Sequence, residues 1–174
     1  YNTTAAAHLL GYIGMMNEQE AEYYVDRGYK FNALVGKDGV EYAFEDYLHG
    51  VDGEAKVTRT ASGTVTSTVY TQEPQPGNNV YLTIDLNLQE AAERALDKSI
   101  TAMNDERRKQ NEEIEQYGGA EEDIQQLIDG GAVVAVKVKT GEPLAIASWP
   151  TFNLTTVLED FNTIKDAENA PLFN

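Results

Sequence analysis

Residues 131–150 have the sequence GAVVAVKVKTGEPLAIASWP, and this stretch decides the fold class. The run from Ala132 to Val138 carries apolar residues on both faces of an extended chain, which is typical of a central strand. The Lys-Thr-Gly-Glu sequence of residues 139–142 then predicts a turn, and residues 144–148 form a second apolar run. We therefore expect two antiparallel strands joined by a short hairpin turn.

The residues before this hairpin predict a long helix. Apolar side chains recur at helical spacing between Leu88 and Met103, and Asn87 followed by Glu90 is typical of a helix start. Either Asp85 or Asn87 is expected to cap this helix. Residues 104–116 are almost wholly polar, so a helix that continued there would project into solvent.

Residues 104–130 are predicted to form an inserted helical hairpin. The glycine pair 118–119 interrupts the polar segment, and a second, acidic helical segment is expected over residues 121–128. The glycine pair 130–131 then returns the chain to the apolar strand.

Two more helix starts are predicted nearer the N-terminus. Asn17 with Glu20, and Asp38 with Glu41, have the spacing at which each side chain can accept a hydrogen bond from a free amide of the first helical turn. Behind the second pair, apolar residues at helical spacing favour a single short helix over residues 38–50.

The middle of the chain predicts strands. Residues 55–60 and 64–71 are expected to form a hairpin, and alternation over residues 80–84 predicts another strand. Gly50 and Gly53 stand where a helix gives way to a strand and are expected to adopt left-handed backbone angles. Together these elements predict an α+β fold with antiparallel hairpins and a small sheet with peripheral helices.

The composition excludes several classes of function. A formal net charge of −16 over 174 residues opposes binding to nucleic acid or anionic lipid, because both carry the same sign as the protein. Cysteine is absent, which excludes disulfides, a thiolate nucleophile and a cysteine-type zinc site. The longest wholly apolar stretch, Ala132 to Val136, is far shorter than a membrane-spanning helix, so any membrane anchor is expected to lie outside this chain.

Four stretches, in order, resemble the N-terminal region of class B penicillin-binding proteins. Residues 8–14, HLLGYIG, are similar to the family's AHxxGYVG stretch, and residues 36–50 followed by Gly53 are similar to its glycine-bounded GLExxYdxxLxG stretch. Residues 76–89 contain LTID followed by LQ, and residues 131–150 match the family's GAvVa and TGexLAxaSxP pattern. The final PLFN, residues 171–174, is similar to the stretch that joins this region to the transpeptidase domain.

The resemblance implies a non-catalytic pedestal, or dimerisation, domain of the elongation type that resembles penicillin-binding protein 2. It implies that residues 1–174 are one pedestal fragment, with a mainly helical head lobe over 1–50 and a strand-rich base lobe over 51–174. The family's own transpeptidase domain, a SEDS-type glycan polymerase and other cell-wall elongation proteins are the expected partners, and a homodimer is the further expected contact. The expected location is the extracytoplasmic face of the bacterial membrane.

The triplet Lys139-Thr140-Gly141 is the one sequence typical of the active site of penicillin-binding enzymes. Those enzymes also need a serine followed by lysine one helical turn later, and the chain has no Ser-x-x-Lys. The nearest candidates are Ser62, Ser67, Ser99 and Ser148, followed at that spacing by Val65, Tyr70, Ala102 and Thr151. We therefore predict a surface hairpin turn at the triplet and no catalytic residues.

Other chemistries receive little support from the sequence. His8 and His49 are the only histidines, neither lies near a serine in a Gly-x-Ser-x-Gly turn, and His49 is expected at a helix end. No calcium-loop pattern is present, and no cofactor or metal site is predicted. Two alternatives stay open: a glycan hydrolase that uses the abundant carboxylates, and a free-standing cell-surface binding module.

Overall fold

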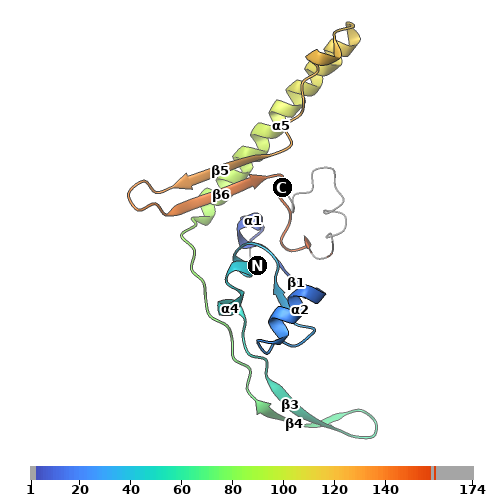
Figure 1. Cartoon of the computed structure of the whole chain (residues 1–174), viewed down its shortest axis with the longest axis vertical. Coiled ribbons are helices and arrows are strands. Elements are labelled where there is room, and N and C mark those ends of the chain that lie inside the picture. Colours follow the sequence, from blue (N-terminus) through green and yellow to red (C-terminus); the bar gives the residue numbers. More distant parts are fainter. Residues whose placement is uncertain (1–2, 158, 160–174) are drawn as a thin grey trace. The chain divides into compact units, whose positions relative to one another are not determined.

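The computed structural model describes residues 3–157 and 159, which form two compact units. One unit comprises residues 13–81, and the other comprises the described residues before and after it, 3–12, 82–157 and 159. Figure 1 colours both along the chain. These units differ from the predicted head lobe over residues 1–50 and base lobe over residues 51–174, so the division into lobes stays a prediction. The PLFN stretch of residues 171–174, which resembles the junction to the transpeptidase domain, lies outside the described residues.

The unit of residues 13–81 is built on a short antiparallel pair, β1 (Ile13–Met15) and β2 (Leu34–Gly36). Helix α2 (Glu18–Val25) connects the two strands, and α3 (Gly39–Ala43) and α4 (Glu45–Leu48) follow them. The side chain of Val35, in β2, is fully buried.

The two helix starts in this unit differ in their hydrogen bonds. Asn17 and Glu20 form the predicted capping box of α2, each side chain accepting from the backbone amide of the other. Asp38 caps α3 but accepts from the adjacent Gly39 amide. The prediction of a single helix over residues 38–50 was wrong, because Phe44, at φ −118° and ψ 20°, leaves helical geometry between α3 and α4.

Gly50 and Gly53 do not adopt the predicted left-handed backbone angles. A Cβ atom on Gly50 would lie 2.4 Å from the carbonyl oxygen of Gln75, and one on Gly53 would lie 2.9 Å from the nitrogen of Pro74. Close approach of another chain segment, and not backbone conformation, therefore accounts for both glycines.

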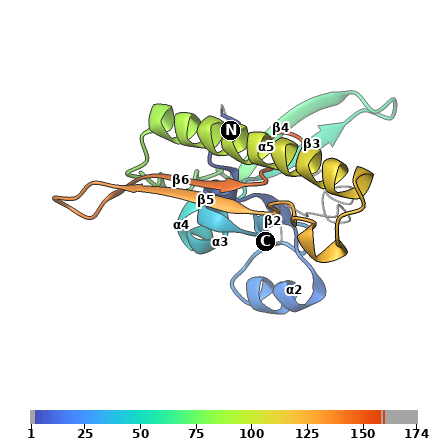
Figure 2. The same cartoon turned by 90° about the horizontal axis from the view of Figure 1, so that it is seen from above.

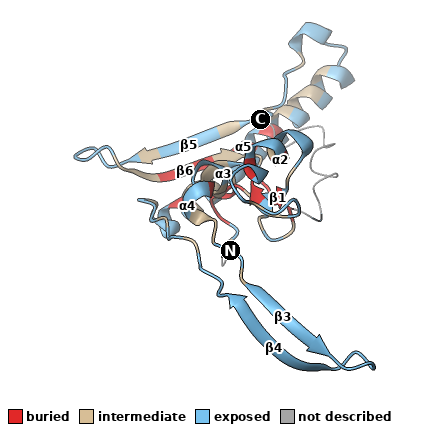
Figure 3. Ribbon diagram, turned by 60° about the horizontal axis from the view of Figure 1, so that its bottom comes forward, coloured by how far each residue is buried: buried red, intermediate tan, exposed pale blue. Residues whose placement is uncertain are grey.

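The predicted hairpin of residues 55–71 is confirmed as β3 (Glu54–Arg59) and β4 (Val65–Gln72). Every residue of both strands is exposed, as the pale blue ribbons in Figure 3 show. The predicted strand over residues 80–84 is not formed. Here the chain makes isolated bonds to the neighbouring β6, from the Thr83 hydroxyl to the Pro143 carbonyl and from the Asp85 amide to the Leu144 carbonyl.

The second unit packs helix α5 (Leu86–Gln116) across the hairpin of β5 (Gly131–Val136) and β6 (Pro143–Trp149), as Figure 2 shows from above. Asp85, and not Asn87, caps α5 by accepting from the Leu88 amide. The predicted hairpin of residues 131–150 is confirmed, and so is the α+β fold class.

A small apolar cluster completes this unit at its N-terminal end. Helix α1 (Ala7–Leu10) contributes Ala7, which packs with Phe152 and Val157. Tyr12 and Leu154 lie against the same cluster.

The inserted segment differs from the predicted helical hairpin. Helix α5 continues without a break to Gln116, but only one 3₁₀ turn, Glu121–Asp123, forms on the way back. The return segment is held by side chains of α5, because Asn104 exchanges hydrogen bonds of 2.7 and 2.8 Å with the backbone of Ile128. The predicted second helix over residues 121–128 is therefore not formed, and hydrogen bonds from α5 side chains hold this segment instead.

The prediction of a central strand was wrong for β5. Among the described residues its one strand partner is β6, and Val134 and Val136 are 59% and 49% exposed. Within the same part of the chain, no helix is both long enough and apolar enough to cross a membrane.

Candidate functional site

An open cleft of about 490 Å³ lies between α2 and the helices α3 and α4. Its lining combines tyrosines with carboxylates: Gln19, Glu20, Tyr23, Tyr24, Tyr42, Ala43, Glu45 and Asp46. Both its walls belong to the unit of residues 13–81, so this unit alone positions the cleft.

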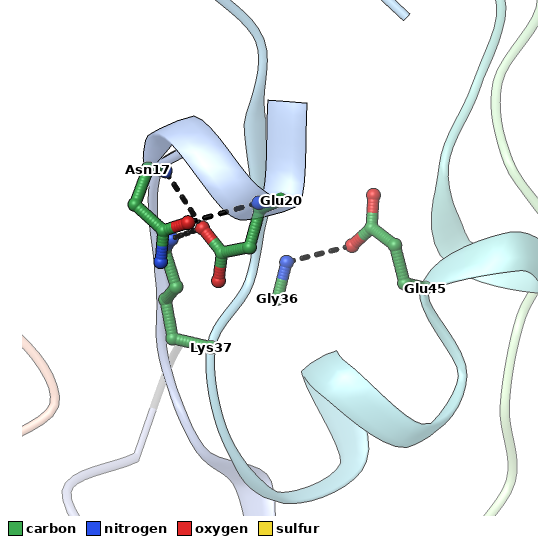
Figure 4. Close-up of polar contacts among 5 residues, drawn as sticks. All are labelled: Asn17, Glu20, Gly36, Lys37 and Glu45. Carbon is green, nitrogen blue, oxygen red and sulfur yellow. Dashed lines mark hydrogen bonds and ion pairs between the residues drawn. The ribbon is translucent and has the colours of Figure 1, made fainter. Parts of the chain in front are cut away.

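Glu20 ties α2 to the end of β2. Its carboxylate accepts from the Asn17 amide at 2.8 Å and forms an ion pair with the Lys37 ammonium group, as Figure 4 shows. Partial burial opposes ionisation of Glu20, but Lys37 and the Asn17 amide outweigh it and lower the pKa of this carboxyl group below its ordinary value. Both contacts hold the Glu20 carboxylate in place at the lining of the cleft.

Glu45 is the buried carboxylate of the site, with 6% of its surface exposed. One oxygen, Oε2, accepts from the Gly36 amide at 2.8 Å, also drawn in Figure 4. The other, Oε1, lies 3.0 Å from Nδ1 of His49, but their geometry does not meet that of a hydrogen bond. The contact is therefore electrostatic, and its strength depends on whether His49 carries a proton.

His49 borders a second open cleft, of about 640 Å³, in the same unit. The Tyr29 ring stacks on the His49 ring with centroids 4.0 Å apart. Burial, followed by the negative charges of Glu45 and Asp46, raises the pKa of Tyr29 to about 12. Tyr29 therefore stays a neutral phenol at physiological pH.

The outer surface of this unit exposes large aromatic side chains. We call Tyr23, Tyr42, Phe44 and Tyr47 the aromatic surface, because each lies on or between α2, α3 and α4 and is 39% to 61% exposed. The Arg27 guanidinium group lies 3.4 Å from the centre of the Tyr23 ring. Exposed tyrosine beside arginine is typical of surfaces that bind other proteins.

The predicted hairpin turn at Lys139-Thr140-Gly141 is confirmed. The amides of Thr140 and Gly141 donate to the carbonyl of Lys137, and Gly141 has a φ of 77°. Glu142 accepts from the Thr140 hydroxyl at 2.8 Å and pairs with Lys137 at 3.1 Å. The triplet is thus engaged in local turn contacts.

The two histidines lie in different units. Nε2 of His8 is 3.0 Å from the carbonyl oxygen of Pro150, and its ring packs edge-on against Phe152. His49 follows the last residue of α4, at the helix end where it was expected. Within residues 3–157 and 159, no group of three or more histidines and carboxylates is arranged to hold a metal ion.

Sequence reasoning did not single out Glu45. Its spacing of four residues from His49 was an available signal, because side chains at that separation meet on one helix face. No local sequence pattern predicts that Glu45 is buried or that it bonds to Gly36, nine residues away.

The sequence model of the family described as "Penicillin-binding Protein dimerisation domain" matches residues 1–82. Residues 1–82 therefore correspond to a penicillin-binding protein dimerisation domain. This confirms the resemblance seen in the sequence, and the matched domain is the non-catalytic part of such proteins.

Curated relatives of the dimerisation domain align over almost the whole chain. The peptidoglycan D,D-transpeptidase MrdA of Acinetobacter baumannii is 30% identical over 97% of this chain and 21% of that protein. MrdA of Escherichia coli K12 is 28% identical over 98% of this chain and 24% of that protein. The chain thus spans about a fifth to a quarter of the length of these relatives.

Solved structures give the same assignment. A chain in a structure described as "Structural coordination of polymerization and crosslinking by a peptidoglycan synthase complex" matches with a TM-score of 0.72 and 34% identity, over 98% of this chain and 28% of that one. Penicillin Binding Protein 2X from Streptococcus thermophilus, 22% identical with a TM-score of 0.54 over 98% of this chain and 20% of its own, shares the fold. These findings favour the dimerisation domain over the glycan hydrolase and the free-standing module.

Proposed function

We propose that this chain is the pedestal of a longer, membrane-anchored peptidoglycan D,D-transpeptidase of the elongation type. The observation that carries the proposal is the alignment of nearly the whole chain with about a fifth to a quarter of two MrdA transpeptidases. In this function the chain holds no catalytic residue and positions a transpeptidase domain that follows it. A head lobe over residues 1–50, a base lobe over 51–174 and an extracytoplasmic location belong to the same proposal.

Covalent labelling with a fluorescent penicillin tests this function. The longer protein encoded by the gene should be labelled, because its transpeptidase domain would supply the reactive serine, whereas the 174-residue chain should stay unlabelled. Labelling of the 174-residue chain would contradict a non-catalytic pedestal. Absence of labelling in a folded longer protein would contradict the transpeptidase.

We further propose that the aromatic surface binds a partner protein, with a SEDS-type glycan polymerase as the first candidate. Support comes from the exposure of Tyr42 and Tyr47, at 60% and 61%, and from the structural neighbour, a chain of a peptidoglycan synthase complex that coordinates polymerization and crosslinking. Buried tyrosines contribute strongly to protein interfaces because they cover large areas at low cost in side-chain entropy.

Copurification from membranes tests the surface. Tyr42→Ser with Tyr47→Ser in the longer protein should reduce recovery of the polymerase at least about tenfold, as expected for loss of interface aromatics. Tyr117→Ser is the matched control, because Tyr117 is 82% exposed at the end of α5 and lies outside the aromatic surface. Equal recovery with both variants would contradict the proposed interface, and unchanged penicillin labelling would show that the variants are folded.

A further inference from the structure

The three helices that line the cleft of about 490 Å³ carry carboxylates and no basic residue. Helix α2 has three glutamates in its sequence EQEAEYYV, and α3 and α4 together contribute Glu41, Glu45 and Asp46. Six carboxylates on three short helices give this part of the unit a negative potential. This potential favours a cationic occupant of the cleft and disfavours an anionic one.

Two basic residues contact the lining of this cleft, and both are already engaged. Lys37 pairs with Glu20, and the Arg27 guanidinium group donates to the Tyr23 carbonyl at 2.9 Å. Within residues 3–157 and 159, no ion pair reaches Asp46, which is exposed at the border of both clefts. Asp46 is therefore an accessible carboxylate that has no cation of its own in this part of the chain.

Glu45 adds a buried negative charge to the lining. Its side chain is almost fully buried, and its Oε1 atom accepts no hydrogen bond from the described residues. This charge acts on the neighbouring ring of the cleft, because burial and then the negative charge of Glu45 raise the pKa of Tyr24. Glu45 therefore attracts an incoming cation together with Asp46.

Three tyrosine rings provide faces on which a cation can stack. The rings of Tyr23 and Tyr24 meet at 90° with their centroids 5.0 Å apart, and Tyr42 lines the same cleft from α3. Tyr23 and Tyr42 are also exposed to solvent. Aromatic rings bind organic cations through the negative charge of their faces, and nearby carboxylates add to this attraction.

One of these rings already accepts a guanidinium group. Arg27 lies 3.4 Å from the centre of the Tyr23 ring, and it borders the second cleft but does not line this one. A guanidinium group is planar, so it can stack on a tyrosine ring while its N–H groups donate to a carboxylate. An ammonium group is more strongly hydrated and cannot stack in this way. The lining of the cleft therefore favours arginine over lysine.

We propose that this cleft receives an arginine side chain of the partner protein that binds the aromatic surface. The guanidinium group stacks on the tyrosine rings and donates to Asp46. This inference rests on the proposed function, because the cleft and the aromatic surface share Tyr23 and Tyr42. It adds the chemistry by which the surface selects its partner, which is a basic side chain among aromatic contacts.

Binding of short peptides to the 174-residue chain tests the arginine site. The probe is an acetylated tripeptide amide with arginine between two glycines, and the matched control carries citrulline, which has the same shape without the charge. Amide NMR shifts of α2, α3 and α4 should saturate with the arginine peptide, and the citrulline peptide should bind at least about tenfold more weakly. Equal binding of the two peptides, or binding of neither, would overturn the proposal. Equal binding of a lysine peptide would overturn the assignment to arginine.

Variants of the chain show whether the peptide binds in the cleft. Asp46→Asn removes the exposed carboxylate and should weaken arginine binding at least about fivefold. Glu22→Gln removes an exposed carboxylate of α2 that does not line the cleft, so it should change binding less than about twofold. Tyr42→Leu should weaken binding and Tyr42→Phe should not, because the ring face binds the cation. Equal effects of Asp46→Asn and Glu22→Gln would assign the binding to overall charge and contradict a site in the cleft.

Copurification of the longer protein separates this inference from the proposed function. Asp46→Asn should reduce recovery of the polymerase, as Tyr42→Ser with Tyr47→Ser should, whereas Glu22→Gln should not. Reduced recovery with the tyrosine variant but full recovery with Asp46→Asn would leave the partner interface and overturn the arginine site. Full recovery with both variants, while the 174-residue chain binds the arginine peptide, would contradict the proposed interface and the partner as the source of the arginine.

Discussion

At the scale of single residues, the dimerisation domain depends on a close fit between a backbone and a carboxylate. The Gly36 amide donates to buried Glu45, and this bond is possible only because the chain of α3 passes directly beside Gly36. A Cβ atom on Gly36 would lie 2.2 Å from the carbonyl carbon and oxygen of Glu41. The obstacle is backbone, which cannot rotate away as a side chain can.

Gly36→Ala should therefore destabilise the domain severely. We expect the free energy of unfolding to fall by about 3 kcal/mol or more, at the upper end for overpacking in a core. Gly130→Ala is the matched control, because its Cβ would meet only the Trp149 carbonyl oxygen at 3.7 Å, an ordinary contact. Urea unfolding measures both, and equal losses would show that the close approach at Gly36 carries no special cost.

The charge of Glu20 gives a prediction for acid pH. Its pKa is lower in the folded state than in an unfolded chain, so its contribution to stability is present above the ordinary glutamate pKa and is lost as pH falls through the folded value. Glu20→Gln should flatten the dependence of unfolding free energy on pH below about pH 4.3, the unperturbed value for glutamate. Glu22→Gln, an exposed change of the same charge on α2, should leave that dependence nearly unchanged.

At the scale of elements, short sequence patterns correctly predicted the caps, turns and hairpins that depend on contacts between residues close together in the chain. The capping box at Asn17, the hairpin of residues 131–150 and the turn at Gly141 depend on neighbours within a few residues, and all three were predicted. The prediction of a second helix in the insertion was wrong because side chains of α5 hydrogen-bond to the backbone of Gln125, Gln126 and Ile128, which form no helix.

The errors at Gly50 and at β5 have the same origin. A glycine required by the approach of a distant segment gives the same sequence signal as one required by a left-handed turn. An apolar strand gives the same signal whether it has one strand partner or two. The buried position of Glu45 likewise depends on the path of β2, which no local pattern specifies.

The Asn104 side chain should hold the insertion in place. It is 5% exposed and satisfies both the amide and the carbonyl of Ile128. Asn104→Ala would leave two backbone groups without partners, so we expect a loss of about 1–3 kcal/mol in unfolding free energy and faster exchange of the Ile128 amide.

Asn111→Ala is the matched control for this prediction. Asn111 makes the same two bonds, to Gln125, at 2.8 and 2.9 Å, but in an exposed position where water can replace them. Its loss should cost less than about 1 kcal/mol. A cost equal to that of Asn104→Ala would mean that burial does not decide the value of these bonds.

At the scale of the whole molecule, charge is the dominant property. Twenty-nine acidic residues against 13 basic ones give a net charge of −16, and the resulting self-repulsion favours the unfolded chain, in which charges lie farther apart. Raising the ionic strength from about 0.1 M to about 1 M shortens the screening length from about 10 Å to about 3 Å. Sodium chloride should therefore raise the thermal unfolding midpoint of the 174-residue chain at pH 7.

The pH dependence of this salt effect separates net charge from individual pairs. Near the isoelectric pH of about 4.3 the net repulsion vanishes, so the same salt should no longer stabilise the chain and should weaken ion pairs such as Lys37 with Glu20. A midpoint that falls with salt at pH 7 would mean that local ion pairs outweigh the repulsion. The acidic surface would then stabilise the domain as a network, and a basic partner would compete with contacts inside the chain.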